Sequence, residues 1–327
     1  MWSAVCGGES QTEMRSLYGT FSLIPAALSI FFLHAIPASP QVRGSYSPGS
    51  VLTGGGTVSD PGFSYDNQVW YIYSDKLKGP QGNAIPIQGS ASFLYDNNSV
   101  IYVPKFKFLH ANLEFSLDLV LSNGSFTASD PLSGRPTQSG SAVGLTNTNV
   151  MPFDLGWHFK WADIQTGYIF AIPTGRYVPN ASDNVSTGFW TSFWQTGATV
   201  YLNKSKNTQI SVLNSYAWNT TQRGTTLHPG QNDSVDYSLT QTISLAKGDR
   251  WPLQFGPAGY GQWETTRAGG QLPARAPLLY GVNAAGFTVN LTAPFKSLNF
   301  GTSALWEYHA RNTYQGRTLV FDANISF

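Results

Sequence analysis

The chain has few charged residues and almost no cysteine. Of its 327 residues, 11% are charged, about half the usual share in globular proteins. The formal net charge is +1, which removes the electrostatic case for a nucleic-acid partner. The single cysteine, Cys6, precedes an expected targeting segment. We therefore expect a mature protein with neither a disulfide nor a thiol site.

A long apolar run is also missing. Residues 21–33 are apolar or small and lead to Ala38, which is typical of a secretory signal and too short for a comfortable membrane-spanning helix. We interpret residues 1–40 as an upstream extension and a signal peptide, with Met14 as the better start and cleavage between Ala38 and Gln41. No later segment could cross a bilayer as a helix, so a membrane-embedded form of this chain must be a barrel.

Aromatic and small polar residues are what the chain has in quantity. Hydrophobic residues make up 41% and aromatic residues 14%, yet the mean hydropathy is -0.16. This composition suits a β-barrel with a lipid-facing outside and a wet inside. A soluble β-sandwich or β-helix of low charge remains an alternative at this point.

Alternation of apolar and polar residues runs through the chain. From Arg317 to Phe327 it is nearly complete, with Leu319, Phe321, Ala323, Ile325 and Phe327 on one parity. A two-residue period predicts strands and excludes helices. Similar strong or weaker alternation marks residues 66–74, 100–108, 113–121, 151–161, 162–172, 188–203, 208–219, 235–245, 251–265, 278–292 and 298–311. The pattern predicts an all-β fold, a transmembrane antiparallel up-and-down β-barrel of about 12 strands.

The connections between these segments alternate in length. The long ones are expected at residues 75–99, 123–149, 173–187, 219–232 and 266–277, and the others are short turns. The one exception to the alternation is the last external turn, residues 312–316, which is short. Outer-membrane barrels have short periplasmic turns and long external loops. We expect a barrel over residues 66–327, preceded by a Gly/Ser/Pro-rich stretch, 41–65, that is a periplasmic lead-in or a partial plug.

Several residues are expected to face the membrane. A barrel of this kind carries aromatic girdles at both interfaces. The expected girdle residues are Trp70, Trp157, Trp161, Trp190, Trp194, Trp218, Trp251, Trp263 and Trp306. Phe321, Ile325 and Phe327 resemble the closing signal of bacterial outer-membrane barrels. The expected location is the outer membrane of a Gram-negative bacterium, and the expected partners are its lipid and the barrel-assembly machinery, which would bind the last strand.

The polar parity of the strands should point into the lumen. The ionisable candidates there are Glu114, Asp118, Asp154, His158, Lys160, Asp236, Glu264, Glu307, His309 and Arg311. They could contact a solute in a narrow passage, or they could form a satisfied hydrogen-bonded filling, as small barrels need. Glu307 and Arg311 share a face and are each expected to pair with a neighbouring strand.

Enzyme chemistry has little support in the sequence. Ser, His and Asp are present, but no nucleophile-elbow signature surrounds them. The five histidines are scattered, and no acidic loop has EF-hand order. We expect no catalytic residue, no metal and no cofactor.

The chain resembles a known family from about Pro61 to Phe327. The matching pieces are Pro61-Gly62-Phe63, Tyr71-Ile72-Tyr73, residues 172–177, 188–191 and 198–201, His228-Pro229-Gly230, Val235-Asp236-Tyr237, residues 306–312, Gly316 and the last Phe. In order and spacing they resemble the outer-membrane proteins of the meta-pathway of phenol degradation. The resemblance implies a barrel of about twelve strands that handles aromatic and hydrophobic compounds. A longer loop before Asn149 and a Pro/Ala-rich stretch at 272–277 depart from the family pattern.

Two classes of function remain open on the sequence. One is a channel or transporter for small hydrophobic or aromatic solutes, which the resemblance favours. The other is a non-transport structural barrel or an outer-membrane hydrolase.

Overall fold

The structure of the chain is a computed structural model. It describes residues 43–85, 89–129, 136–179, 181, 183–246, 250–270, 279–293 and 298–327. The expected signal peptide, residues 1–40, and the stretch 272–277 lie outside the described residues. No helix among the described residues is both long and apolar enough to cross a bilayer.

The described chain is almost entirely β-strand. The strands are β1 (Gly62–Leu77), β2 (Gly89–Val103), β3 (Lys107–Phe108), β4 (Ala111–Ser129), β5 (Pro136–His158), β6 (Ala162–Ile172), β7 (Thr191–Tyr201), β8 (Thr208–Asn219), β9 (Asn232–Ala246), β10 (Arg250–Glu264), β11 (Gly281–Thr292), β12 (Leu298–Arg311) and β13 (Tyr314–Ser326).

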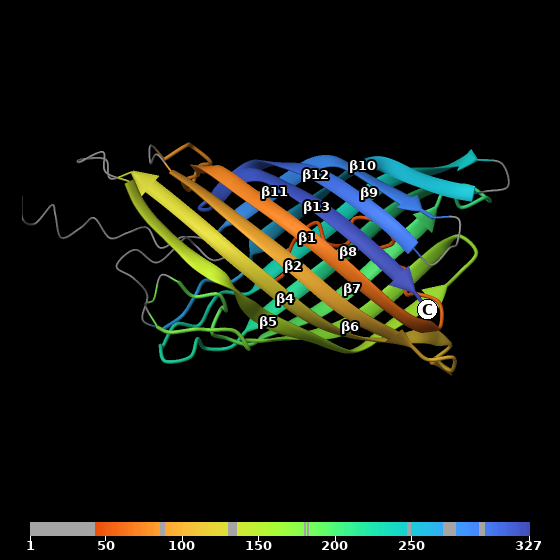
Figure 1. The fold of residues 1–327 in the computed structure, drawn as a ribbon, viewed down its shortest axis with the longest axis horizontal. Helices are drawn as coiled ribbons and strands as arrows, with labels where there is room; N and C mark the ends of the chain where they lie inside the picture. Colours follow the sequence, from red (N-terminus) through yellow and green to blue (C-terminus); the bar gives the residue numbers. More distant parts are fainter. Residues whose placement is uncertain are drawn as a thin grey trace, which may run out of the picture. The chain divides into compact units, whose positions relative to one another are not determined.

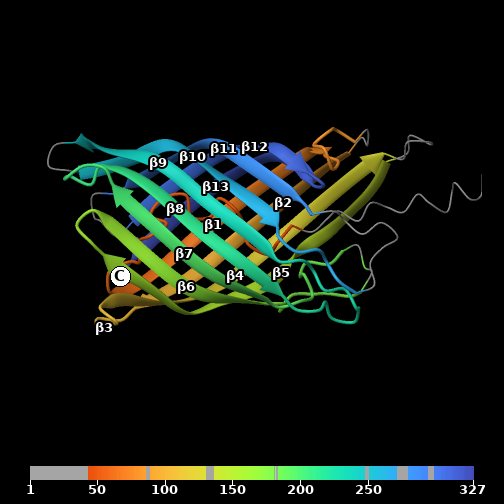
Figure 2. The same cartoon turned by 180° about the vertical axis from the view of Figure 1, so that it is seen from behind.

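The strands close into a barrel of twelve. Each long strand pairs antiparallel with its neighbours in sequence, and β2 pairs directly with β4 because β3 is only two residues long. The ring closes where β1 pairs with β13, from Ser64 opposite Ser326 to Leu77 opposite Tyr314. Figures 1 and 2 show these strands tilted around a common axis. Closure removes the unpaired edges that an open sheet would leave.

Alternating burial separates the two faces of the wall. On β4, Phe115, Leu117, Leu119 and Leu121 are exposed, whereas the residues between them, Ser116, Asp118 and Val120, are partly buried. The apolar parity therefore faces outward, toward lipid, and the polar parity faces inward. This is the arrangement expected of a membrane barrel.

Strand lengths differ from the expectation at one end of the barrel. β2 begins at Gly89, β4 extends to Ser129 and β5 begins at Pro136. Most residues of the two expected loops, 75–99 and 123–149, therefore belong to paired strands. These stretches are rich in Gly, Ser, Thr and Asn on both faces, so they pair through backbone without the apolar alternation that membrane contact imposes. β1 likewise begins at Gly62, ahead of the expected residue 66.

The barrel has two distinct ends. At the short-turn end, β5 connects to β6 through residues 159–161 and β7 to β8 through 202–207. At the long-loop end, residues 173–190 join β6 to β7 and residues 220–231 join β8 to β9. Short turns are periplasmic in outer-membrane barrels.

Apolar packing inside the barrel involves the chain ahead of β1. Leu52 belongs to a buried cluster with Tyr260, Val282 and Leu305 on β10, β11 and β12. Tyr46 packs on a second cluster that includes Phe193 of β7. The segment preceding the first strand is therefore part of the barrel interior.

Candidate functional site: the lumen and its inner segment

Residues 43–60, which we call the inner segment, lie against the inward faces of the strands. Figures 1 and 2 both show this stretch within the ring of strands. It begins near Glu307 and Thr313, toward the long-loop end, and reaches Asn112 and Asp163 at the short-turn end before β1 starts. It therefore runs along the lumen.

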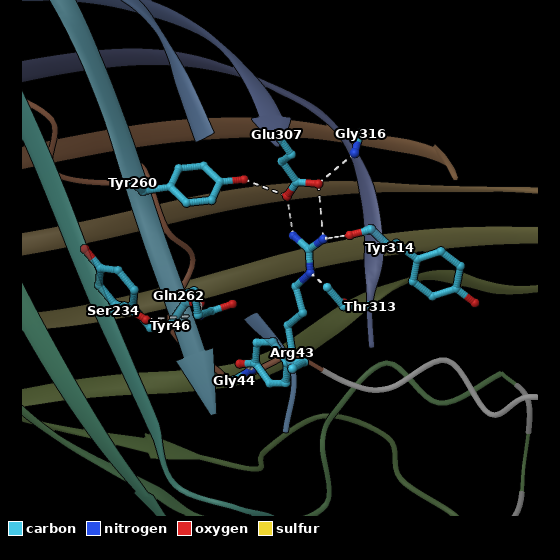
Figure 3. A network of polar contacts seen from close by, with 11 residues as sticks. Arg43, Gly44, Tyr46, Ser234, Tyr260, Gln262, Glu307, Thr313, Tyr314 and Gly316 are labelled. Atoms are coloured by element: carbon cyan, nitrogen blue, oxygen red, sulfur yellow. Dashed lines mark hydrogen bonds and ion pairs between the residues drawn. The ribbon is translucent and has the colours of Figure 1, made fainter. Parts of the chain in front are cut away.

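Arg43 anchors one end of the inner segment (Figure 3). Its guanidinium holds both carboxylate oxygens of Glu307, with Nη2 to Oε2 at 3.1 Å, and Nε donates to Thr313 Oγ1 at 3.2 Å. It also donates to the carbonyl of Tyr314. The Glu307 side chain is 0% exposed, and it further accepts from Tyr260 Oη at 2.7 Å. Such a two-pronged arginine–carboxylate contact is among the stronger hydrogen-bonded pairs in proteins.

Asp236 on β9 holds the next part of the segment. Its carboxylate accepts from Tyr46 Oη at 2.7 Å, from the Gly49 amide at 2.8 Å and from the Val51 amide at 3.2 Å. Asp236 is 0% exposed. A buried charge of this kind is tolerated because three donors surround it.

Glycines let the backbone of the segment approach the wall closely toward the short-turn end. The amide of Gly55 donates to Ser211 Oγ at 2.6 Å and that of Gly56 to Thr199 Oγ1 at 3.0 Å. A Cβ on Gly56 would collide with the backbone of Asp163 and Thr199. Only glycine permits this backbone approach.

Polar contacts also hold the segment at the short-turn end. Thr57 Oγ1 donates to Asp163 Oδ2 at 3.2 Å, and Asn112 Nδ2 donates to the carbonyl of Ser59 at 3.2 Å. Tyr201 Oη donates to the same Asp163 oxygen at 2.5 Å. The inner segment is thus held at both ends and in the middle.

Space remains beside the segment. A half-open cavity of about 400 Å³ lies at the short-turn end, between Thr53 of the segment and the wall. Its lining is almost wholly polar and comprises Thr53, Asp66, Thr242, Pro252, Gln254, Asn290, Thr292, Asn299, Asp322 and Asn324. These side chains come from the inner segment, β1 and the β9–β13 wall, and the lining contains neither lysine nor arginine.

Most of the expected lumen residues lie on the inward parity. Asp154 and Glu307 are buried, and Asp236 holds the inner segment. Glu114 accepts weakly from the Ser59 amide, and Asp118 lies four residues further along β4. His158 ends β5, with Nδ1 3.3 Å from Asp163 Oδ1. Glu264 is the last residue of β10 and is partly buried.

Three expected lumen residues lie elsewhere. Lys160 is in the turn after β5, exposed beside the ring of Trp161. His309 has a φ of 50°, and there the alternation of β12 shifts, so that Ala310 is buried while His309 and Arg311 are exposed. Arg311 therefore does not share the face of Glu307, which pairs with Arg43 instead.

The expected girdle has one exception. Trp161, Trp190, Trp194, Trp218, Trp251 and Trp306 are exposed on the outer surface, and Trp157 and Trp263 are partly exposed. Trp70 is only 4% exposed and shares the inward parity of Ser64 and Ser74. Its placement in the girdle was wrong, because composition alone does not show on which parity a tryptophan stands.

Sequence reasoning missed the partners that the inner segment supplies. Arg43 is the only lysine or arginine between Arg15 and Lys76, and that isolation was the available signal. Asp66 and Asp163 stand on the inward parity and could have been included by the same rule as Asp154. Within the described chain, no three His, Cys, Asp or Glu side chains lie together as a metal site would require.

Solved structures with a similar fold are also membrane barrels. The COG4313 outer membrane channel from Pseudomonas putida F1 aligns with a TM-score of 0.65 and 11% identity, over 86% of this chain and 100% of that one. The beta domain of the Bordetella autotransporter BrkA aligns with a TM-score of 0.51 and 9% identity, over 82% and 100%. At such identities the likeness concerns the fold alone.

Sequence comparison gives the family. No curated protein matches the chain. The profile of the family described as MetA-pathway of phenol degradation matches residues 74–323, which is most of the chain and nearly the whole barrel. The chain therefore belongs to this family, and its fold is a closed β-barrel of twelve strands.

Proposed function

We propose that this protein is an outer-membrane channel for small hydrophobic or aromatic compounds, narrowed by its inner segment. The observation that carries the proposal is a closed barrel whose polar lumen keeps a cavity of about 400 Å³ beside the inner segment. A barrel filled only for stability would be expected to pack its interior completely. The similar Pseudomonas barrel is described as a channel, and the family name connects the chain with phenol degradation.

The inner segment acts as a partial plug in this proposal. Its contacts with Glu307, Asp236 and Asp163 fix it along the lumen. A solute would pass between the segment and the wall, and the cavity beside Thr53 would be the part of that path at the short-turn end. The inner segment, which is not part of the barrel wall, would then set the size of the passage.

The outer face of the barrel indicates which partners would contact the channel from outside. Lipid would cover the exposed apolar parity, with the exposed tryptophans near the interfaces. Phe321 and Phe327 are 53% and 80% exposed on the last strand, where the assembly machinery would bind. A channel of this kind needs no catalytic residue, so we include the absence of enzyme activity in the proposal.

Two measurements test the channel. Planar bilayers should show single-channel currents, and liposomes containing the protein should swell faster in phenol or benzyl alcohol than in a sugar of similar size. A deletion strain should take up such aromatics more slowly, and plasmid-borne protein should restore uptake. If the protein gives neither current nor swelling, and the deletion strain takes up aromatics normally, the channel proposal is wrong and the protein is a sealed structural barrel.

A further inference from the structure

Charge is unevenly distributed between the rims and the lumen. The chain has nearly equal numbers of basic and acidic residues, 19 and 18. Among the described residues, however, every charged side chain that is buried is acidic: Asp154, Asp163, Asp236 and Glu307. Asp66, Glu114, Asp118 and Asp322 add four partly buried carboxyl groups on the inward parity.

The basic residues lie mainly at the ends of the barrel. Lys105, Lys107, Lys160, Lys204 and Lys206 are exposed at the short-turn end. Arg43 is the one arginine seen among the lumen carboxyls, and both prongs of its guanidinium are used by Glu307. A passage lined by one sign of charge between low-dielectric walls concentrates ions of the opposite sign.

Glu114 and Asp154 form an opposed pair within this lining. They are direct partners in the β4–β5 register, and both stand on the inward parity. Like charges directly opposite each other on neighbouring strands destabilise a sheet. Asp154 is 4% exposed, and its Oδ1 has no hydrogen-bond partner among the described atoms.

No basic side chain that the structure describes compensates this pair. The Ser59 amide donates to Glu114 at 3.4 Å, the Leu155 amide hydrogen-bonds to Asp154, and the His158 ring is directed to Asn112 and Asp163. Asp154 Oδ1 is therefore a buried carboxylate oxygen for which the described part of the protein supplies no positive charge. Rings of Asp and Glu are the usual lining of cation-selective pores.

We propose that the lumen passes cations in preference to anions, and that Glu114 and Asp154 form the position at which a permeating cation binds. The ligand class is an alkali-metal ion or a small organic ammonium group. This inference rests on the proposed channel and narrows its cargo. Neutral or positively charged aromatics would pass, whereas aromatic carboxylates and phenolates would be repelled.

The test is the zero-current potential of the full-length protein in a planar bilayer under a KCl gradient. We expect the wild type to prefer K⁺ over Cl⁻ by about tenfold, and Glu114→Gln with Asp154→Asn to reduce that ratio at least about threefold. Asp96→Asn is the matched control, since Asp96 is on the outward parity of β2 and hydrogen-bonds to Asn67 at 2.6 Å. It removes one carboxylate outside the lumen, as Glu114→Gln alone does inside it, and should leave the ratio unchanged.

The possible results separate this inference from the channel itself. A wild type that conducts but prefers anions, or a double variant that conducts with the wild-type ratio, overturns the inference and leaves the channel standing. A wild type that carries no current contradicts both. Heat-modifiable gel mobility shows whether each variant is folded. Glu114→Gln alone, expected to lower the ratio by a smaller amount, gives the answer if the double variant does not fold.

Discussion

At the scale of single residues, the interior of this barrel depends on how each buried charge is neutralised. Glu307 and Asp236 are both fully buried, and both are satisfied by groups of the inner segment. Glu114 accepts a long hydrogen bond of 3.4 Å from the Ser59 amide, and Asp154 Oδ1 has no hydrogen-bond partner among the described atoms. We interpret the first two as anchors of the inner segment and the second two as groups available to a solute.

Arg43→Gln should test the anchor at Glu307. Glutamine can still donate one hydrogen bond, but it leaves the Glu307 carboxylate buried without a counter-charge. Removing one partner of a buried pair costs about 3 kcal/mol or more, so the free energy of unfolding in lipid vesicles should fall by that amount and single-channel conductance should rise. Arg176→Gln is the control, because the exposed Arg176–Asp183 pair should contribute less than about 1 kcal/mol. Equal effects of the two changes would show that Arg43 is no anchor.

Gly56→Ala should test the closest approach of segment and wall. The added Cβ would meet the backbone of Asp163 and Thr199, which cannot rotate away as a side chain can. We expect a loss of about 1–3 kcal/mol of stability from this overpacking and a displaced segment, read as higher conductance. Gly269→Ala is the control, since its Cβ would have its nearest neighbour at 3.9 Å. Wild-type conductance and stability in Gly56→Ala would contradict the described contact.

At the scale of elements, strands were predicted well where they contact lipid and poorly elsewhere. On β4 and β13 the apolar parity was correct because the membrane demands it. The hairpin of β4 and β5 extends beyond the part of the wall where lipid requires an apolar parity. Its sequence there does not distinguish paired strand from loop. The shift at His309 was equally invisible, because a β-bulge adds a residue without a composition signal.

The inner segment was foreseen only as a lead-in or partial plug. Its Gly/Ser/Pro composition indicates irregular chain, but its position depends on partners far away in sequence. Arg43 finds Glu307, and Tyr46 finds Asp236. Such long-range pairing has no local pattern, which is why Glu307 was expected to pair with a neighbouring strand.

Deleting residues 44–57 should test the inner segment as an element. Without it the lumen loses its central obstruction, and single-channel conductance should rise about twofold or more, since an unfilled barrel of this strand number leaves an open interior. Stability should fall, because Asp236 and Asp163 lose donors from Tyr46 and Thr57. Unchanged conductance in a barrel that still shows heat-modifiable mobility would mean that solutes do not pass beside the segment.

At the scale of the whole molecule, the defining feature is the contact between the first and last strands. A soluble sandwich, the alternative left open by composition, has no reason to join them. In this chain β1 and β13 pair along their full length. That single pairing converts a row of antiparallel hairpins into a closed wall, which is what makes an interior possible at all.

A disulfide between the first and last strands should therefore form and stabilise the barrel. Ser64 and Ser326 are register partners with their Oγ atoms 3.3 Å apart, and the only natural cysteine, Cys6, lies in the expected leader. Ser64→Cys with Ser326→Cys closes nearly the whole barrel sequence into one loop, for which chain entropy predicts about 5.5 kcal/mol. Ser90→Cys with Thr127→Cys joins β2 to β4, where the hydroxyls are 3.0 Å apart, and closes a much shorter loop worth about 4 kcal/mol. Thermal unfolding in detergent, with and without reductant, should show the larger shift for the first pair. If the first pair fails to oxidise while the second does so, β1 and β13 are not neighbours, and the closed barrel is wrong.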